Sequence, residues 1–134
     1  MANENNNKPV LTVENLKVTF TTPDGEVEAV KGTSFSVAKG ETLAIVGESG
    51  SGKSQTMMGI MGLLAANGRV SGSARYGDKE LVGASLSDLN RVRGSKITMI
   101  FQEPMTSLDP LYTIGKQIAE PLIHHRGMGK GEAR

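Results

Sequence analysis

Residues 47–54 read GESGSGKS and match the pattern G-x-x-x-x-G-K-[ST] at every fixed position. An apolar run over residues 42–46 precedes this motif, and apolar residues at helical spacing follow it. Glycines allow backbone angles that a side chain would forbid, so consecutive N–H groups can turn inward around phosphate oxygens. Lys53 would bring a compact positive charge to the β- and γ-phosphates, and the Ser54 hydroxyl could ligate Mg²⁺. The motif therefore predicts a phosphate-binding loop between a buried strand and a helix.

Two other interpretations of this segment explain it less well. An ordinary Gly/Ser-rich turn needs no particular residues, whereas every fixed position of the pattern is filled here. A dinucleotide-binding fingerprint would need a third glycine three residues after Gly52, where the chain has Gln55. Phosphate binding is the interpretation that accounts for both the glycines and the lysine.

Composition limits the class of protein and its partners. A chain of 134 residues with 37% hydrophobic and 22% charged residues is long enough for one folded domain with a sizeable core. The net charge of +1 argues against a strongly electrostatic nucleic-acid surface, so we expect no nucleic-acid partner. Because the chain has no cysteine, disulfides and thiolate metal sites are excluded. The Asn-rich start carries no secretory signal, and we expect it to be a floppy tail.

Apolar patterning and turn residues predict a strand-rich N-terminal part. Three strands are expected to form an antiparallel β-unit before the loop, with a turn at Pro23-Asp24-Gly25. A buried strand should then end at Val46 and lead into the loop. The expected strands cover residues 10–20, 27–30, 33–37, 42–46, 69–76 and 96–101.

Three helices are expected after the loop. The first should span residues 54–66 and end at Asn67-Gly68, and its apolar face should pack into the core rather than form a binding surface. A short helix should open near Ser85 or Ser87, and a third should run from about residue 113, with Pro121 kinking it or delaying its start. The expected apolar faces are Met57, Ile60, Met61 and Leu64 for the first helix, and Ile114, Ile118 and Leu122 for the third.

The order of these features resembles the nucleotide-binding domain of ABC transporters. The loop follows a block of apparent antiparallel strands, and Gln102 ends an apolar strand 49 residues after Lys53, like the residue of the family's Q-loop. Phe20, at the end of the first strand, is similar to the family's A-loop aromatic. The phrases over residues 40–56 and 100–110 are similar to the oligopeptide/dipeptide importer branch.

This resemblance implies an α/β fold, with a P-loop NTPase core, an N-terminal antiparallel β-subdomain, and truncation at the start of the helical subdomain. It divides the chain into a disordered tail (1–9), an ATP-binding core (10–102), and a Q-loop with the start of the helical subdomain (103–134). The family's signature sequence, the Walker B strand and the switch His are not recognisable, so we expect the N-terminal part of a longer subunit.

The resemblance also assigns roles to residues. Gln102 would act in catalysis and, with Ser54, bind Mg²⁺. Phe20 would stack on adenine, although a strand Phe is more often a core residue. Glu103 follows Gln102 but should not be taken for the catalytic base, because no Asp precedes it. The residues expected to contact ATP are Phe20, Gly47, Glu48, Ser49, Gly50, Ser51, Gly52, Lys53, Ser54 and Gln55.

The implied function is ATP binding and, in the complete subunit, ATP hydrolysis that powers peptide import. The implied cofactors are ATP and Mg²⁺, and the implied partners are a second ATP-binding subunit and membrane-spanning permease subunits, at the cytoplasmic face of the membrane. The alternatives are a non-transport ABC-type ATPase that acts on DNA or ribosomes, and a nucleotide-binding fragment without enzymatic activity. We expect residues 1–134 alone to be inactive. The solute stays open between an oligopeptide, a dipeptide, nickel or another compound.

Overall fold

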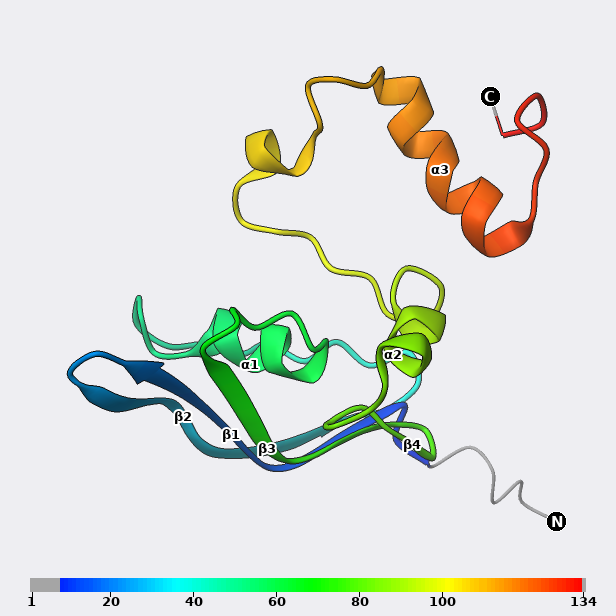
Figure 1. Cartoon of the computed structure of the whole chain (residues 1–134). Coiled ribbons are helices and arrows are strands. Elements are labelled where there is room, and N and C mark those ends of the chain that lie inside the picture. The colour runs from blue at the N-terminus through cyan, green and yellow to red at the C-terminus, as the bar shows by residue number, and fades with distance from the viewer. Residues whose placement is uncertain (1–7, 134) are drawn as a thin grey trace, which may run out of the picture. The chain divides into compact units, whose positions relative to one another are not determined.

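The computed structural model describes residues 8–133, apart from the side chain of Pro104, and divides the chain into two compact units with a boundary between Ser85 and Leu86. The expected N-terminal tail lies largely outside the described residues, although Lys8 forms an ion pair with Asp78. The elements, in chain order, are β1 (Leu11–Thr22), β2 (Gly25–Val37), α1 (Lys53–Ile60), β3 (Gly68–Tyr76), β4 (Lys79–Glu80), α2 (Leu86–Val92), the 3₁₀ helix η2 (Pro104–Ser107) and α3 (Ile114–Arg126) (Figure 1).

The first unit is built on an antiparallel sheet with the strand order β2-β1-β3-β4. This confirms the expected antiparallel β-unit and the strand over 69–76. The two short strands expected over 27–30 and 33–37 are one continuous β2, because Val30 and Thr33 both pair with β1, opposite Val18 and Leu16. A shift in pairing between these positions takes up the residues that had suggested a break.

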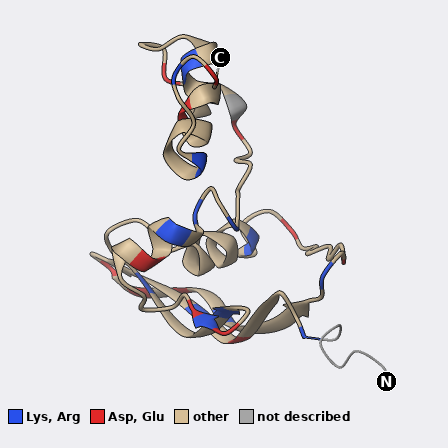
Figure 2. Ribbon diagram, turned by 90° about the vertical axis from the view of Figure 1, so that its right-hand side faces the viewer, with Lys and Arg blue, Asp and Glu red and all other residues tan. Residues whose placement is uncertain are grey.

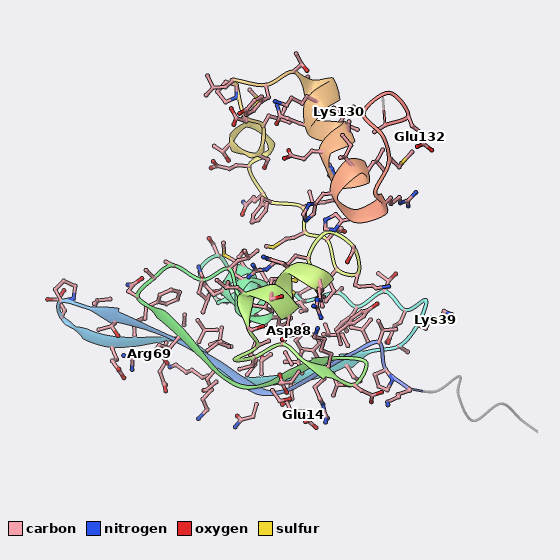
Figure 3. All side chains as sticks on the ribbon, turned by 45° about the vertical axis from the view of Figure 1, so that its right-hand side comes forward. Glu14, Lys39, Arg69, Asp88, Lys130 and Glu132 are labelled. Carbon is pink, nitrogen blue, oxygen red and sulfur yellow. The ribbon has the colours of Figure 1, made fainter. Side chains whose placement is uncertain are left out.

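The core of this unit lies between the sheet and α1. Apolar side chains from four elements are buried there, and the side chains on the other face of the sheet are mostly polar, as at Glu14, which points away from α1 (Figure 3). Gly59 brings the helix close to the sheet, since a Cβ there would lie 3.1 Å from Val18 Cγ2. Each fully buried Val, Leu or Ile contributes about 1.5–3 kcal/mol. The buried residues include Val13, Leu16, Val18, Val30, Ile60, Met61 and Ala74.

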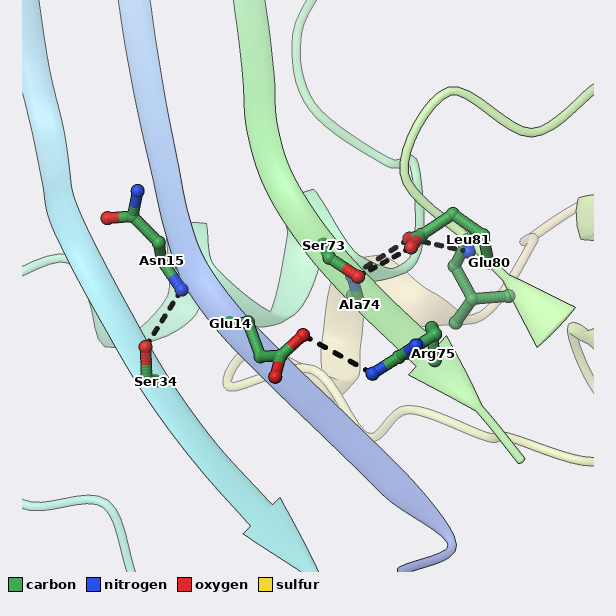
Figure 4. A network of polar contacts seen from close by, with 8 residues as sticks. All are labelled: Glu14, Asn15, Ser34, Ser73, Ala74, Arg75, Glu80 and Leu81. Carbon is green, nitrogen blue, oxygen red and sulfur yellow. Dashed lines mark hydrogen bonds and ion pairs between the residues drawn. The ribbon is translucent and has the colours of Figure 1, made fainter. Parts of the chain in front are cut away.

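A bulge in β1 centres on Asn15, which has a left-handed φ of 48°. Its backbone N–H donates to Ser34 Oγ at 2.8 Å, and the neighbouring Glu14 pairs with Arg75 at 3.3 Å (Figure 4). Both adjacent strands have a glycine at this point. A Cβ at Gly32 would lie 2.6 Å from Asn15 Oδ1, and one at Gly72 would overlap the carbonyl oxygen of Asn15. The two glycines therefore make room for the bulge.

Helix α1 is shorter than expected, and the predicted end at Asn67-Gly68 is wrong. Gly62 has a φ of 64° and ends the helix in a Schellman motif, with Gly62 N–H donating to Gly59 O at 3.2 Å and Leu63 N–H to Met58 O at 2.8 Å. Asn67 instead joins β3 to β1 through two 3.0 Å hydrogen bonds with the backbone of Thr21. Burial of Ile60 and Met61 confirms that the apolar face of this helix packs in the core.

Two strands expected from the sequence are absent among the described residues. Residues 41–48 and 98–101 form no ladder, and Val46 and Ile100 are 89% and 97% exposed. In the strand expected over 96–101, the described chain has one isolated bridge, between Ile97 and Arg93. An apolar run becomes a buried strand only if neighbouring strands take up its backbone N–H and C=O groups, and no such neighbour exists between residues 8 and 133.

The second unit contains α2, η2 and α3. The start of α3 was predicted correctly, since Thr113 Oγ1 accepts a hydrogen bond from Lys116 N at 3.3 Å as its N-cap. The helix continues through Pro121, and it buries Ala119 while Ile114 and Ile118 are 60% and 65% exposed. The expected apolar face of this helix is therefore largely unburied. None of the helices between residues 8 and 133 has the length and apolar character that crossing a membrane requires.

The carboxylate of Glu80 joins β3 to β4. It accepts hydrogen bonds from Ser73 Oγ at 2.5 Å, Ala74 N at 2.8 Å, Val82 N at 3.0 Å and Leu81 N at 3.1 Å, most of which Figure 4 shows. Partial burial acts to raise the pKa of Glu80, but these donors outweigh it and hold the pKa below the ordinary 4.5. The charged form of Glu80 therefore stabilises the fold.

We predict that Glu80→Gln lowers the free energy of unfolding by about 1–2 kcal/mol at pH 7, because the charge-assisted bonds are lost. A carboxyl whose pKa is depressed by folding stabilises above its unfolded pKa, so the difference from the wild type should shrink as the pH falls below about 4.5. Urea unfolding at pH 7 and pH 3 measures both effects. The control is Glu28→Gln on β2, an exposed glutamate, and an equal loss in both variants would contradict the prediction.

Gly52 fixes the end of the loop against the sheet. Its φ is 89°, and a Cβ would overlap the carbonyl oxygen of Ala29 and approach Val30 Cγ2 to 3.1 Å, both in β2. Gly50 has a similar φ of 79°, but a Cβ there meets nothing within 4 Å. Substituting each of these two glycines by alanine therefore separates the loss of stability due to the backbone angle from the loss due to packing against β2.

We predict that Gly50→Ala costs about 1–2 kcal/mol of stability, since only the left-handed angle is penalised. Gly52→Ala should cost a further 1–3 kcal/mol or so, because the new methyl group also displaces the loop from β2. Chemical denaturation of the two variants and the wild type gives the comparison. Equal losses would show that the loop does not depend on its contact with β2.

Candidate functional site

The candidate site is the loop of residues 47–53, which connects the extended segment before it to α1 (Figure 1). Gly50 and Gly52 both adopt left-handed backbone angles, as the sequence motif predicts. Gly47 is needed for a different reason, since a Cβ there would lie 2.6 Å from Ser51 Oγ. Two of the three motif glycines are therefore needed for their backbone angles, and the third is needed because Ser51 packs close to it.

Lys53 lies inside this loop. Its Nζ donates hydrogen bonds to Gly47 O and Glu48 O, both at 2.7 Å, and to Ser51 Oγ at 3.2 Å. All three acceptors are uncharged, so the ammonium charge is solvated by the loop but not neutralised. A phosphate oxygen in the same place would accept a hydrogen bond from the Lys53 ammonium. Because that oxygen is negatively charged, this bond would be stronger than the bonds to the uncharged acceptors.

The start of α1 adds further donors to the loop. The first N–H groups of any helix have no intrahelical acceptor, and at Lys53 and Ser54 they carry the positive end of the helix dipole. No acidic residue lies in the first turn to compete for them. The Ser54 hydroxyl is exposed, which fits its expected role as a Mg²⁺ ligand, whereas Gln55 is half-buried.

Thr56 is a residue of the site that the sequence analysis missed. It is 5% exposed, and its Oγ1 donates to Gly52 O at 2.9 Å, to which its N–H also donates at 2.8 Å. These two hydrogen bonds to one carbonyl join Gly52, the N-cap of α1, to the first turn of the helix. A Thr four residues after the final glycine could have indicated it, since Thr in helices often bonds the carbonyl of residue i−4.

Phe20 occupies a packing position near the end of β1. It pairs with Val27 of β2 and Gly68 of β3, and its Cε1 lies 2.8 Å from where a Cβ of Gly68 would be. The ring is half-buried against this glycine. Both interpretations of Phe20 agree with this position, because a ring that packs on a glycine can still present one face to solvent.

Gln102 belongs to the second unit, whereas the loop belongs to the first. It lies in the irregular stretch before η2, and its side chain is exposed. The strand that was expected to position it, over residues 96–101, does not form a ladder in the described chain. The structure therefore brings the loop residues together within the first unit, and the role of Gln102, which lies in the second unit, stays a prediction.

Charge and metal-binding groups outside the loop are dispersed. Figure 2 shows basic and acidic residues interspersed along the ribbon. Between residues 8 and 133 no group of three or more His, Cys, Asp or Glu side chains could hold a metal ion. His124 and His125 form an edge-to-face ring contact at 4.8 Å and are both exposed. The loop combines a lysine, glycine backbone and the start of a helix, an arrangement that suits an anionic ligand with its counter-ion.

Known transport ATP-binding proteins are similar in sequence to most of this chain. The oligopeptide transport ATP-binding protein OppD of Escherichia coli is 54% identical over 124 residues, which cover 92% of this chain and 37% of that protein. The dipeptide transport ATP-binding protein DppD of Bacillus subtilis is 50% identical over 127 residues, or 93% of this chain and 38% of the relative. The chain thus spans well under half the length of these relatives.

The fold of the chain is similar to that of a solved ATP-binding cassette. The ATP-binding cassette MJ0796, a dimer bound to ADP and Pi, superposes with a TM-score of 0.79 at 27% identity, over 92% of this chain and 52% of that one. This likeness confirms the expected α/β fold with an N-terminal antiparallel β-subdomain. The family model for ABC transporters matches residues 30–132. The chain therefore belongs to the ABC transporter family.

Proposed function

We propose that residues 47–54 bind Mg·ATP and that the chain is the ATP-binding part of a subunit that powers peptide import. One observation carries the proposal: Lys53 Nζ lies inside a glycine loop, 2.7 Å from two loop carbonyls, next to the free N–H groups of α1. The relatives described above are named oligopeptide and dipeptide transport ATP-binding proteins, which supports peptide as the solute class.

Binding would exchange partners within the loop. Lys53 would give up the carbonyls of Gly47 and Glu48 for β- and γ-phosphate oxygens, and the loop N–H groups would surround the β-phosphate. Ser54 would offer its exposed hydroxyl as a ligand to Mg²⁺, and the metal would supply positive charge that offsets the charge of the phosphates. Glu48, Ser49 and Ser51 would contribute mainly backbone N–H groups. Phe20 would offer the exposed face of its ring to adenine, and base stacking of this kind is worth about 1–3 kcal/mol.

Hydrolysis would need groups beyond those in this chain. Phosphoryl transfer depends on positioning and charge stabilisation, and among residues 8–133 no catalytic carboxylate can be assigned near the loop. We infer that the complete subunit hydrolyses ATP with a second ATP-binding subunit, at the cytoplasmic face of a membrane that holds the permease subunits. Residues 1–134 alone should show no steady hydrolysis. A role on DNA or ribosomes is disfavoured by the names of the relatives, which are transport proteins.

We predict that Lys53→Ala lowers the affinity of the chain for Mg·ATP on the order of a hundredfold, since two charge-assisted contacts with phosphate are removed. Isothermal titration calorimetry measures the change. The matched control is Lys39→Ala, which removes an exposed lysine just before the segment that leads into the loop and should leave the affinity unchanged. Equal affinities of wild type and Lys53→Ala would refute the assignment of the loop.

We predict a different effect for Gln102→Ala, tested in the complete subunit assembled with its membrane partners. Nucleotide affinity should stay within about threefold, because the loop supplies most of the binding energy. Hydrolysis stimulated by transported substrate should fall by roughly tenfold, somewhat less than the cost of losing an oxyanion-hole donor. ATPase rates with and without substrate are compared, with the neighbouring Glu103→Gln as control. Full stimulation in Gln102→Ala would remove Gln102 from the mechanism.

A further inference from the structure

A second site rich in basic groups lies within the C-terminal unit. A pocket of about 360 Å³ opens between the loop that follows α2 and the last turns of α3, a size found for small-ligand pockets. No acidic residue lines it. The lining residues are Gly94, Ser95, Lys96, Pro121, Leu122, His125 and Arg126.

Two of the three basic side chains in this pocket lack a counter-charge. Among residues 8–133, neither Lys96 nor Arg126 takes part in the ion pairs found, such as Lys8 with Asp78 and Arg75 with Glu14. Like charges that line one pocket repel each other. An anion bound between them would attract both and offset this repulsion. The basic residues at the end of α3 also complement the helix dipole. That explanation does not extend to Lys96, which comes from a different segment.

Backbone hydrogen bonds fix the main chain from which the two cationic side chains extend. On one side, Lys96 N and Ile97 N both donate to Val92 O, at 2.9 and 3.1 Å. On the other side, Gly127 adopts a φ of 64° after Arg126, and its N–H donates to Ile123 O at 3.1 Å. This capping bond occupies one of the last carbonyls of α3, which would otherwise repel an anion.

His125 joins the two sides of the pocket. A Cβ at Gly94 would lie 2.6 Å from its Nε2, so the ring can lie here only because residue 94 is a glycine. Gly94 has a φ of 75°, and its N–H donates to Ile97 O at 2.9 Å, which closes the loop. The Ser95 hydroxyl donates its proton to Arg91 O at 2.7 Å. The groups left to hold a ligand are the ammonium of Lys96, the guanidinium of Arg126 and the imidazole of His125.

We propose that this pocket binds a small oxyanion of the phosphate class, either inorganic phosphate or the phosphoryl group of a phosphomonoester. Arg126 presents a planar fork of donors that matches two phosphate oxygens, and Lys96 provides a point charge for a third. The site is separate from the loop at residues 47–54, and it belongs to the other unit.

The test is a titration followed by ¹H–¹⁵N NMR in a Lys53→Ala background, which silences the loop as a phosphate site. Adding inorganic phosphate should produce saturable shifts at the amides of 94–96 and 125–127, with a Kd in the millimolar range. A parallel titration with glycerol 3-phosphate distinguishes the sources. Tighter binding of the ester assigns the site to phosphomonoesters, and equal binding assigns it to the phosphoryl group itself.

The double variant Lys96→Gln/Arg126→Gln should weaken binding about tenfold or more, while Lys130→Gln, a basic residue of the same unit outside the pocket, should not. Both pocket side chains are exposed, so these changes should leave the fold intact, which unchanged amide shifts in α2 and in the first turns of α3 would verify. Shifts that grow linearly without saturation, that sodium chloride reproduces at equal ionic strength, or that persist in the double variant would overturn the proposal.

Discussion

The close approach of α1 to the sheet determines where the phosphate loop lies. Two glycines make that approach possible: Gly59 lets the helix contact Val18, and Gly52 lets the end of the loop rest on Ala29. Both contacts are with strands whose buried side chains form the core, so the loop is fixed against this core. A flexible loop would lose conformational entropy on binding a ligand, whereas this one has most of its backbone already arranged.

The loop is also arranged around its own lysine. In the structure Lys53 bonds the carbonyls that a triphosphate would face, so the ammonium is held in place by the protein before any ligand arrives. Replacement of neutral acceptors by charged phosphate oxygens favours the nucleotide, while the lost carbonyl bonds oppose it. The net affinity therefore reflects the difference between the charge-assisted bonds gained to phosphate and the carbonyl bonds lost.

Local patterns predicted the elements that depend on local chemistry. The motif at 47–54 identified the loop and the glycines whose backbone angles it needs, and Thr113 marked the start of α3. The strands expected at 42–46 and 96–101 failed because a strand needs partners, and apolar content alone does not supply them. The predicted end of α1 at Asn67-Gly68 is too late, because Gly62 can also adopt the left-handed angle that ends a helix and does so here. Packing contacts such as Gly52 on Ala29 join residues far apart in the chain, and no sequence period announces them.

The bulge at Asn15 has a consequence for how the sheet can be assembled. Asn15 fits only where both flanking strands offer a glycine, at Gly32 and Gly72. If β2 slid by one residue, Lys31 or Thr33 would face the bulge, and a slide of β3 would bring Ser71 or Ser73 there. Each of these residues carries a Cβ, so every neighbouring alignment is penalised sterically, in addition to exposing buried residues. The bulge and its two glycines therefore fix the register of the three long strands.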